Sequence, residues 1–363
     1  MGLSTILTIA SLIGIVVLLY MIDQHGFLGS YWTRVLRLSG VYAISALSMN
    51  LVNGFTGQFS LGHAGFMAIG AYVTSLLIIP TPNKAIQYYV TPVLDFVGKM
   101  HAPFWLALIL GGLLAAIAAF FIGFPVLRLK GDYLAIATLG FSEIIRIFIT
   151  NLIPITNGPM GLKNIPASAN IWWTTGICTL TVVFMLRLMD TSYGRAIKAI
   201  RDDETAAEAM GISLFRHKMM AFMMGAFFAG VSGGLIASVV GTINPGFFRF
   251  TLAYEILLIV VLGGLGSITG SVVGAFVLTI SREWLRFLDN GFSILGIIKV
   301  PPIAGMRMLF FSVLLMIVIL YSRRGLFGSN EFTWAGLFAF PGKWKNKAAN
   351  LFDSAKQKAG RKK

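Results

Sequence analysis

The sequence predicts an all-α polytopic membrane protein of about ten transmembrane helices, some of them broken by glycine. The chain has 363 residues, of which 56% are hydrophobic and only 12% are charged. A soluble domain carries roughly a quarter charged residues. Apolar runs of about 20 residues, the length that spans a bilayer as a helix, recur along the chain. Residues 38–83 contain no Asp, Glu, Lys or Arg, so two spans and their connection fit inside this stretch.

Ten apolar runs are the predicted spans. They lie at residues 3–22, 36–52, 60–79, 104–127, 133–153, 170–189, 219–242, 250–266, 268–285 and 306–322. The first run has no basic residue before it and no small-residue cleavage site after it, so we expect a retained span and not a signal peptide. Residues 1–328 therefore form the predicted transmembrane domain, and residues 329–363 form a basic tail.

The distribution of Lys and Arg predicts the orientation. Residues 187–218 carry six of them and the tail carries more, so both segments are expected in the cytoplasm. Four predicted spans separate the two segments, an even number, so the assignments agree. The N-terminus is then also cytoplasmic. Arg34 and Arg37 fall outside in this arrangement, against the rule.

Several functional classes lack their sequence signature. No Gly-x-x-x-x-Gly-Lys-Ser/Thr loop occurs, so we expect no ATPase site in this chain. Four histidines, scattered at positions 25, 63, 101 and 217, predict neither a metal cluster nor another cofactor. The net charge of +15 gathers at membrane edges and in the tail, a pattern that the positive-inside rule explains without nucleic acid.

The longest polar stretch between predicted spans, residues 190–218, has the pattern of two short amphipathic helices. Apolar residues recur at helical spacing, and Asp202, Asp203 and Glu204 suit the first turn of the second helix. Gly211 is placed to end that helix. Four acids between 202 and 208 favour a protein partner over an anionic lipid surface, although an interfacial helix remains the alternative.

A glycine-rich stretch, residues 54–66, interrupts the early spans. Broken, polar backbone at membrane depth is tolerated where it lines protein or a water-filled cavity. A tight turn between spans is the equally plain alternative. The residues of this stretch that we assign to a translocation pathway are Gly54, Gly57, Gln58, Ser60, Gly62 and His63.

Carboxylates inside predicted spans form the third group of candidates. Glu143 lies three residues before Arg146 on one helix face and can form a structural ion pair or line a pathway. Glu255 is the only charged residue between positions 250 and 281, and it needs a proton, water or a partner. Glycines at 266, 270 and 274 form successive Gly-x-x-x-Gly steps, which are typical of helix contacts.

Two of these stretches resemble a known family. The run from Gly194 to Gly211 resembles the coupling loop of the LivM-type permeases of branched-chain amino acid importers, which are ATP-binding-cassette (ABC) systems. Thr205 stands where the general importer motif has Glu. Residues 54–66 resemble the Gly-x-x-Gly-x-x-Ser-Leu-Gly-His signature of the LivH/LivM permease family, and residues 156–166 resemble its external loop.

The resemblance covers about residues 40–290 and implies a permease that works without enzymatic activity of its own in a bacterial cell membrane. The implied partners are a second, LivH-like permease, two ATPase subunits similar to LivG and LivF, an external solute-binding protein, and the lipid bilayer. The implied ATPase-coupling residues are Arg201, Asp203, Glu204, Ala207 and Gly211. A urea or short-amide permease of the same family is one alternative. An ion-coupled secondary transporter using Glu143 and Glu255 is another, and a structural scaffold is a third.

Overall fold

The computed structural model describes residues 29–88, 92–288, 292–294 and 298–300, with isolated positions 309, 312, 313, 316, 325 and 328. The predicted span 3–22 and the tail 329–363 lie outside the described residues, as does most of the span 306–322. The predicted cytoplasmic positions of the two termini lie outside them as well.

Helices occur at the eight predicted spans within the described residues. They are α2 (Gly29–Asn50), α3 (His63–Ile78), α6 (Phe104–Val126), α7 (Asp132–Asn151), α9 (Ile171–Asp190), α12 (Leu214–Val240), α13 (Phe250–Gly263) and α14 (Ile268–Trp284). In the described part of the chain, five helices are long and apolar enough to cross a membrane, or six if one bent pair counts as a single span. The expected number of about ten is therefore not confirmed.

The bent pair leaves the prediction of separate spans at 250–266 and 268–285 unconfirmed. Helices α13 and α14 meet at 120°. The 14 residues of α13 extend about 21 Å, less than the roughly 30 Å of a hydrocarbon core. Gly264 and Gly266 lie between them with φ angles of +120° and +81°, which residues with side chains rarely adopt. The glycines that look like helix-contact positions in the sequence thus also turn the chain.

Helices α3 and α12 form the centre of the bundle, together with α6 and α2. Glycines let these helices approach closely, as small residues do in membrane proteins. A Cβ at Gly70 of α3 would lie 2.0 Å from the carbonyl oxygen of Gly230 in α12. One at Gly111 of α6 would lie 3.0 Å from the carbonyl oxygen of Gly70. Side-chain packing is thus replaced by backbone contact at the crossing of three helices.

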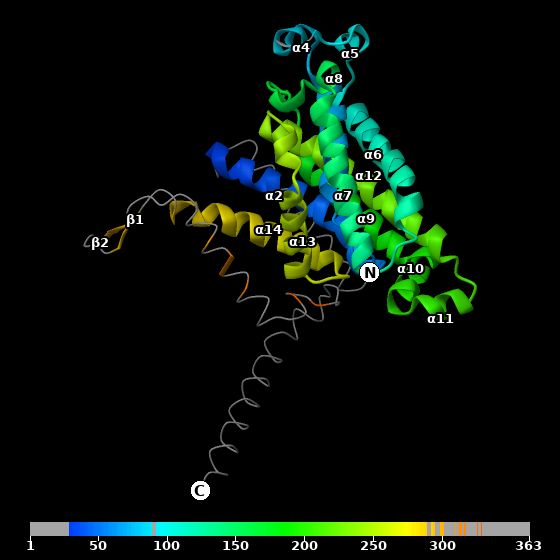
Figure 1. The fold of residues 1–363 in the computed structure, drawn as a ribbon. Helices are drawn as coiled ribbons and strands as arrows, with labels where there is room; N and C mark the ends of the chain where they lie inside the picture. Colours follow the sequence, from blue (N-terminus) through cyan, green and yellow to red (C-terminus); the bar gives the residue numbers. More distant parts are fainter. Residues whose placement is uncertain are drawn as a thin grey trace, which may run out of the picture.

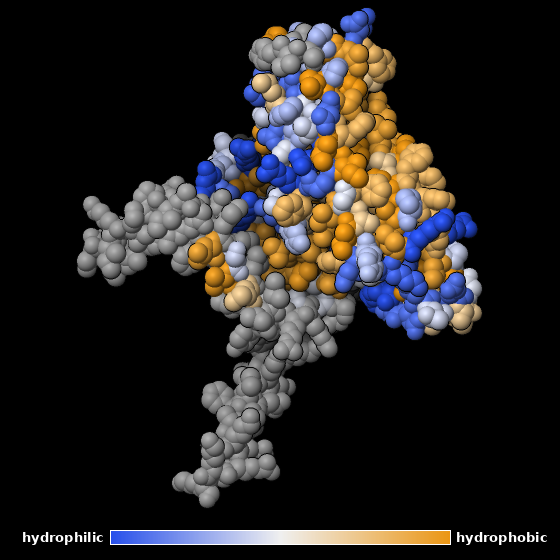
Figure 2. All heavy atoms as spheres, viewed as in Figure 1, coloured by the Kyte–Doolittle hydropathy of each residue, from blue (hydrophilic) through white to orange (hydrophobic). Residues whose placement is uncertain are grey.

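Helices α6, α7 and α9 form the flank of the bundle. About 28% of the apolar stretch of α7, and the same share in α9, is buried, against 78% for α2. Large apolar side chains such as Phe121, Ile136 and Leu180 stand exposed along these helices. Figure 2 shows the hydrophobic surface along the flank between two more polar ends. An apolar surface of this extent is suited to lipid.

The two ends of the bundle carry different short helices (Figure 1). At one end, which we call the coupling end, lie α10 (Ser192–Asp202) and α11 (Glu204–Ala209). At the other, which we call the cap end, lie α4 (Thr81–Gln87), α5 (Asp95–Lys99) and α8 (Ile153–Thr156). These short helices lie in the connections between α3 and α6, between α7 and α9, and between α9 and α12.

Shorter elements complete the described chain. A π-helical turn covers Leu51–Phe55, and 3₁₀ turns cover Gly158–Met160, Pro245–Phe248 and Leu285–Leu288. Strands β1 (Phe292–Ile294) and β2 (Ile298–Val300) pair antiparallel, with Ser293 opposite Lys299. This hairpin is the one departure from all-α structure among the named elements, and it lies within a segment expected to be a connection.

Candidate functional site

Helices α10 and α11 at the coupling end are anchored by apolar residues on one side. Ile197, Ile200 and Ala207 are buried, and α10 packs on α9, α12 and the π-helical turn. Gly194 makes the closest approach, because a Cβ there would lie 2.3 Å from the carbonyl oxygen of Leu188. The amphipathic pattern of the sequence thus corresponds to one face on the bundle and one face in solvent.

Capping contacts fix the break between the two helices. The Asp203 carboxylate accepts hydrogen bonds from the backbone N–H groups of Thr205 (2.8 Å) and Ala206 (3.1 Å), as an N-cap does. Glu204 forms an ion pair with Lys218 at the start of α12. Gly211 follows α11 with a φ of +82°, the left-handed conformation that commonly ends helices. Asp203, Glu204 and Gly211 therefore shape α11, as the residue types suggest.

The solvent face of this pair carries acids and large apolar side chains. Asp202, Asp203 and Glu208 are exposed, and Met210 is 82% exposed. The sequence pattern grouped Met210 with the buried apolar positions. Its place at the C-cap of α11 turns it outward instead, and only the rotation of the helix reveals this.

Arg201 points back toward the bundle. Its Nη2 atom lies 2.9 Å from Asp202 Oδ1. A Cβ at Gly57 would lie 3.1 Å from Arg201 Cγ, and a Cβ at Gly266 would lie 3.1 Å from Arg201 Nη1. The Arg201 side chain of α10 thus contacts both the break after α2 and the break between α13 and α14.

The break after α2 is an ordered structure. The Thr56 N–H donates to the Leu51 carbonyl at 3.2 Å, a π-helical bond, and the Gln58 N–H donates to the Val52 carbonyl. Asn53 and Ser60 exchange two hydrogen bonds, in which the Asn53 side chain pairs with the Ser60 backbone at 3.1 and 3.2 Å. The glycine-rich stretch is therefore an ordered loop, held by these backbone bonds and by the Asn53 side chain.

Asn50 joins this break to the one between α13 and α14. Its side-chain nitrogen donates to the Ser267 carbonyl (2.9 Å) and to Ser271 Oγ (2.8 Å). Its side-chain oxygen accepts from the Gly266 N–H at 2.9 Å. Gly54 has no room for a side chain, since its Cβ would lie 1.8 Å from Asn50 Oδ1. Asn50 was missed by the sequence analysis, because its partners are over 200 residues away.

The remaining pathway candidates of the stretch are inside the protein. Gln58 is buried, and its side-chain amide has no hydrogen-bond partner among the described residues. His63 begins α3 and is also buried. A Cβ at Gly62 would lie 3.3 Å from the backbone carbonyl oxygen of Thr138 in α7. The side-chain hydroxyl of Thr138 accepts a hydrogen bond from the Leu61 N–H. The stretch thus packs between α7 and the coupling end.

Glu143 and Arg146 of α7 form an ion pair, with Nε and Oε2 separated by 2.6 Å. The other Glu143 oxygen accepts from the Phe250 N–H at 3.3 Å, at the start of α13. A carboxylate at this position satisfies a free helix N–H and faces the positive end of the helix dipole. The pair therefore has a structural role in holding α7 to α13.

Glu255 has a partner, one of the three outcomes expected from the sequence, although the sequence did not identify the residue. Arg282 Nη1 of α14 lies 2.7 Å from Glu255 Oε2 of α13, and both side chains are about one-third exposed. The pair connects the two arms of the bent helix pair. Among the described residues, no group of three His, Cys, Asp or Glu side chains is arranged to hold a metal ion.

The helices of membrane length, the apolar flank and the broken helices define a multi-pass membrane protein. A family model described as "Branched-chain amino acid transport system / permease component" matches residues 31–320. The chain belongs to this family, and is a multi-pass plasma membrane protein.

Three relatives illustrate the similarity. The chain is 38% identical to the "High-affinity branched-chain amino acid transport system permease protein LivM" of Escherichia coli (strain K12), over 69% of this chain and 63% of that protein. It is 25% identical to a probable LivM of Methanocaldococcus jannaschii, over 81% and 92%. It is 27% identical to LivH of E. coli (strain K12), over 68% and 82%. The chain thus spans less than two thirds of the E. coli LivM protein. No solved structure matches it.

Proposed function

We propose that the chain is the LivM-type permease subunit of an ATP-driven ABC importer that translocates leucine, isoleucine and valine. The observation that carries the proposal is Arg201. In a chain of this permease family, a residue of an amphipathic surface helix touches two helix breaks inside the bundle. Such a contact can pass the movement of an external motor to the membrane helices.

The coupling end faces the cytoplasm in this proposal, and the cap end faces the outside. Basic residues gather at the coupling end, where Arg128 and Lys130 join α6 to α7 and Arg187 ends α9. Cytoplasmic connections carry such an excess of Lys and Arg. The outer cap then presents α4, α5 and α8 to an extracytoplasmic solute-binding protein, and the basic segment 329–363 is a cytoplasmic tail.

The motor consists of two ATPase subunits that bind the solvent face of α10 and α11. Met210 supplies an exposed apolar side chain, and Asp202, Asp203 and Glu208 supply exposed negative charge on the same pair of helices. An exposed amphipathic helix that inserts in a groove is a common mode of recognition. Asp203, Glu204 and Gly211 shape α11 for this contact, Ala207 anchors it, and Arg201 transmits its displacement inward.

The translocation pathway lies beside residues 54–63, at an interface with a second, LivH-like permease. Gln58 brings an unpaired amide to this region, and a polar site of this kind suits the charged backbone of an amino acid. Glu143 and Glu255 take part through the ion pairs that position α13. The chain itself has no enzymatic role and uses no cofactor in this proposal.

The alternatives from the sequence fit less well. An ion-coupled transporter needs a carboxylate that changes its protonation during transport. Glu143 and Glu255 are each paired with an arginine within 2.7 Å, so each carboxylate already has a charged partner inside the protein. The names of the relatives above concern branched-chain amino acids, and they do not favour urea or short amides.

Reconstitution tests this function. The chain is co-expressed with its candidate permease, ATPases and binding protein, and leucine uptake into vesicles is measured with ATP or with a proton gradient alone. We expect uptake that requires ATP and the binding protein. Uptake driven by the gradient alone would refute the importer assignment, and ATP-driven uptake of urea in preference to leucine would refute the cargo.

A further inference from the structure

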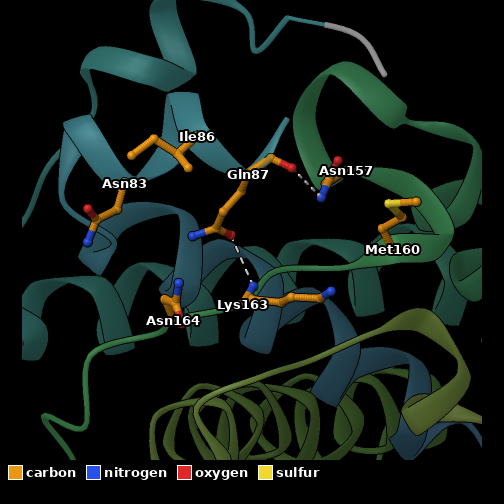
Figure 3. Close-up of a pocket in the computed structure, with 7 residues that line it drawn as sticks. All are labelled: Asn83, Ile86, Gln87, Asn157, Met160, Lys163 and Asn164. Atoms are coloured by element: carbon orange, nitrogen blue, oxygen red, sulfur yellow. Dashed lines mark hydrogen bonds between the residues drawn. The ribbon is translucent and has the colours of Figure 1, made fainter. Parts of the chain in front are cut away.

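A cavity of about 220 Å³ opens at the cap end, between α4 and the loop that follows α8. A single water molecule needs about 10–15 Å³ by this measure, so the cavity can hold a larger group. Figure 3 shows the residues that line it, which come from two segments about 70 positions apart. These residues are Asn83, Ile86, Gln87, Asn157, Met160, Lys163 and Asn164.

Gln87 is built into the wall of this cavity as a hydrogen-bond donor. Its side-chain oxygen accepts a hydrogen bond from the Lys163 backbone N–H at 3.0 Å. This bond identifies the oxygen and the nitrogen of the Gln87 side-chain amide. Its backbone carbonyl accepts from the Asn157 side chain at 3.2 Å. Gln87 is only 8% exposed, and its side-chain nitrogen has no partner among the described residues. In Figure 3 this nitrogen points between Asn83 and Asn164.

An unpaired buried N–H₂ group costs free energy unless a ligand accepts from it. The described lining residues include three asparagines and Lys163, and none of them is acidic. Lys84 of the same helix is also buried, and its ammonium donates to the carbonyls of Val97 and Met100 and has no acidic partner among the described residues. The local charge of the cavity therefore favours an anion that accepts hydrogen bonds.

Apolar and rigid features complete the site. Ile86 and Met160 supply apolar walls. The loop is pinned to the segment before α13 by two backbone hydrogen bonds of 2.9 Å between Leu162 and Ile243. The Asn157 side chain also donates to the Gly161 carbonyl at 2.9 Å. The cavity is thus preformed, which lowers the cost of binding.

We propose that this cavity binds a carboxylate carried on a short aliphatic stem. The carboxylate accepts from the Gln87 side-chain nitrogen and is attracted by Lys163, and the stem contacts Ile86 and Met160. Two sources have this chemistry: a free branched-chain amino acid, and an acidic side chain of an extracytoplasmic binding protein. The carboxylate site itself stands on the geometry, and only these sources rest on the proposed function.

The first arm of the test measures binding of small probes to the purified transporter without ATP, by saturation-transfer NMR. The probes are leucine, 4-methylpentanoate, which lacks the ammonium group, and 3-methylbutylamine, which lacks the carboxylate. The key variant is Gln87→Glu. It keeps the oxygen that accepts from Lys163 and replaces the free donor by a negative oxygen. Asn170→Asp makes the same charge change at the start of α9, outside the lining.

We expect 4-methylpentanoate and leucine to bind, and 3-methylbutylamine to bind far less. Gln87→Glu should weaken carboxylate binding about tenfold or more, the scale of one hydrogen bond to a charged group, and Asn170→Asp should not. The second arm measures association of the purified binding protein by surface plasmon resonance, with the same two variants.

The two arms identify the source and can overturn the site. An effect of Gln87→Glu in the first arm identifies the free amino acid, and an effect in the second arm alone identifies a side chain of the partner. If Gln87→Glu changes neither probe binding nor association of the binding protein more than Asn170→Asp does, the proposal is wrong. Neither arm uses transport, so failure of the importer assignment is seen separately, in the uptake assay.

Discussion

Arg201 of α10 lies against Gly57, which belongs to the break after α2. A Cβ at residue 57 would be 3.1 Å from Arg201 Cγ and 3.4 Å from Arg201 Cα. Gly57 has a φ of +72°, so two separate constraints select glycine there. The contact links α10 to the helix break that follows α2. It leads directly to a test of coupling.

Gly57→Ala should separate ATP hydrolysis from transport. The new methyl group pushes Arg201 away, and the φ angle adds strain of about 1–2 kcal/mol. In proteoliposomes we expect ATP hydrolysis to continue while leucine uptake falls about tenfold. Gly176→Ala in α9 is the control, because its Cβ meets nothing within 4 Å. Equal loss of hydrolysis and uptake would contradict a transmitting role for this contact.

Gly70→Ala should destabilise the centre of the bundle. Its Cβ would lie 2.0 Å from the Gly230 carbonyl oxygen, and backbone cannot rotate away as a side chain can. Overpacking of this kind typically costs about 1–3 kcal/mol. Thermal unfolding of the detergent-purified protein should show a lowered Tm. Gly140→Ala in α7, where a Cβ has open space, should leave the Tm within about a degree or raise it.

Asp203→Ala should loosen α11 by removing its N-cap, at a cost of about 1 kcal/mol. Recovery of ATPase subunits with the tagged chain should fall. Asp203→Asn keeps an oxygen that can accept the same two hydrogen bonds, so it should restore most of the recovery. If Asn is as poor as Ala, the charge of Asp203 matters to the ATPase and the cap does not.

Arg282→Gln should leave the Glu255 carboxylate without its partner. Breaking a fully buried pair costs about 3–5 kcal/mol, and exposure of one-third of each side chain reduces this to about 1–2 kcal/mol. The double variant Glu255→Gln/Arg282→Gln removes both charges and should be more stable than the single variant. A double-variant cycle on Tm measures the coupling. Additive effects would show that the pair contributes nothing to stability.

Much of this organisation follows from local sequence. Apolar runs place the eight described long helices, and Asp203 and Gly211 mark the two ends of α11 because capping depends on neighbouring residues. The rotation of each helix about its axis, and hydrogen bonds between residues distant in the chain, do not follow from local sequence. Met210 is exposed, Arg201 turns inward, and Asn50 bonds with Ser267 and Ser271.

The bend between α13 and α14 was hidden for a related reason. Hydropathy counts apolar residues but does not show where a chain reverses, and the glycines at 264 and 266 resemble ordinary helix-contact glycines. Glu255 was predicted to need a partner, proton or water. Its pairing with Arg282 depends on the bend, because the bend brings the two helices together.

Lys84 of the cap gives a pH test. Burial removes the Lys84 ammonium from water and so lowers its pKa from the usual 10.5, and among the described residues its partners are carbonyls and not carboxylates. Between the lowered value and 10.5 the unfolded chain binds more protons than the folded one. The contribution of Lys84 to the free energy of unfolding therefore rises with pH between the lowered pKa and 10.5. Below the lowered pKa this contribution does not change with pH. The Tm of Lys84→Met relative to wild type should thus be highest at pH 7.5 and decline toward pH 10. Lys99→Met removes an exposed lysine of the same cap and should track the wild type. If the Tm of Lys84→Met and that of Lys99→Met differ from wild type by the same amount at every pH, burial does not lower the pKa of Lys84.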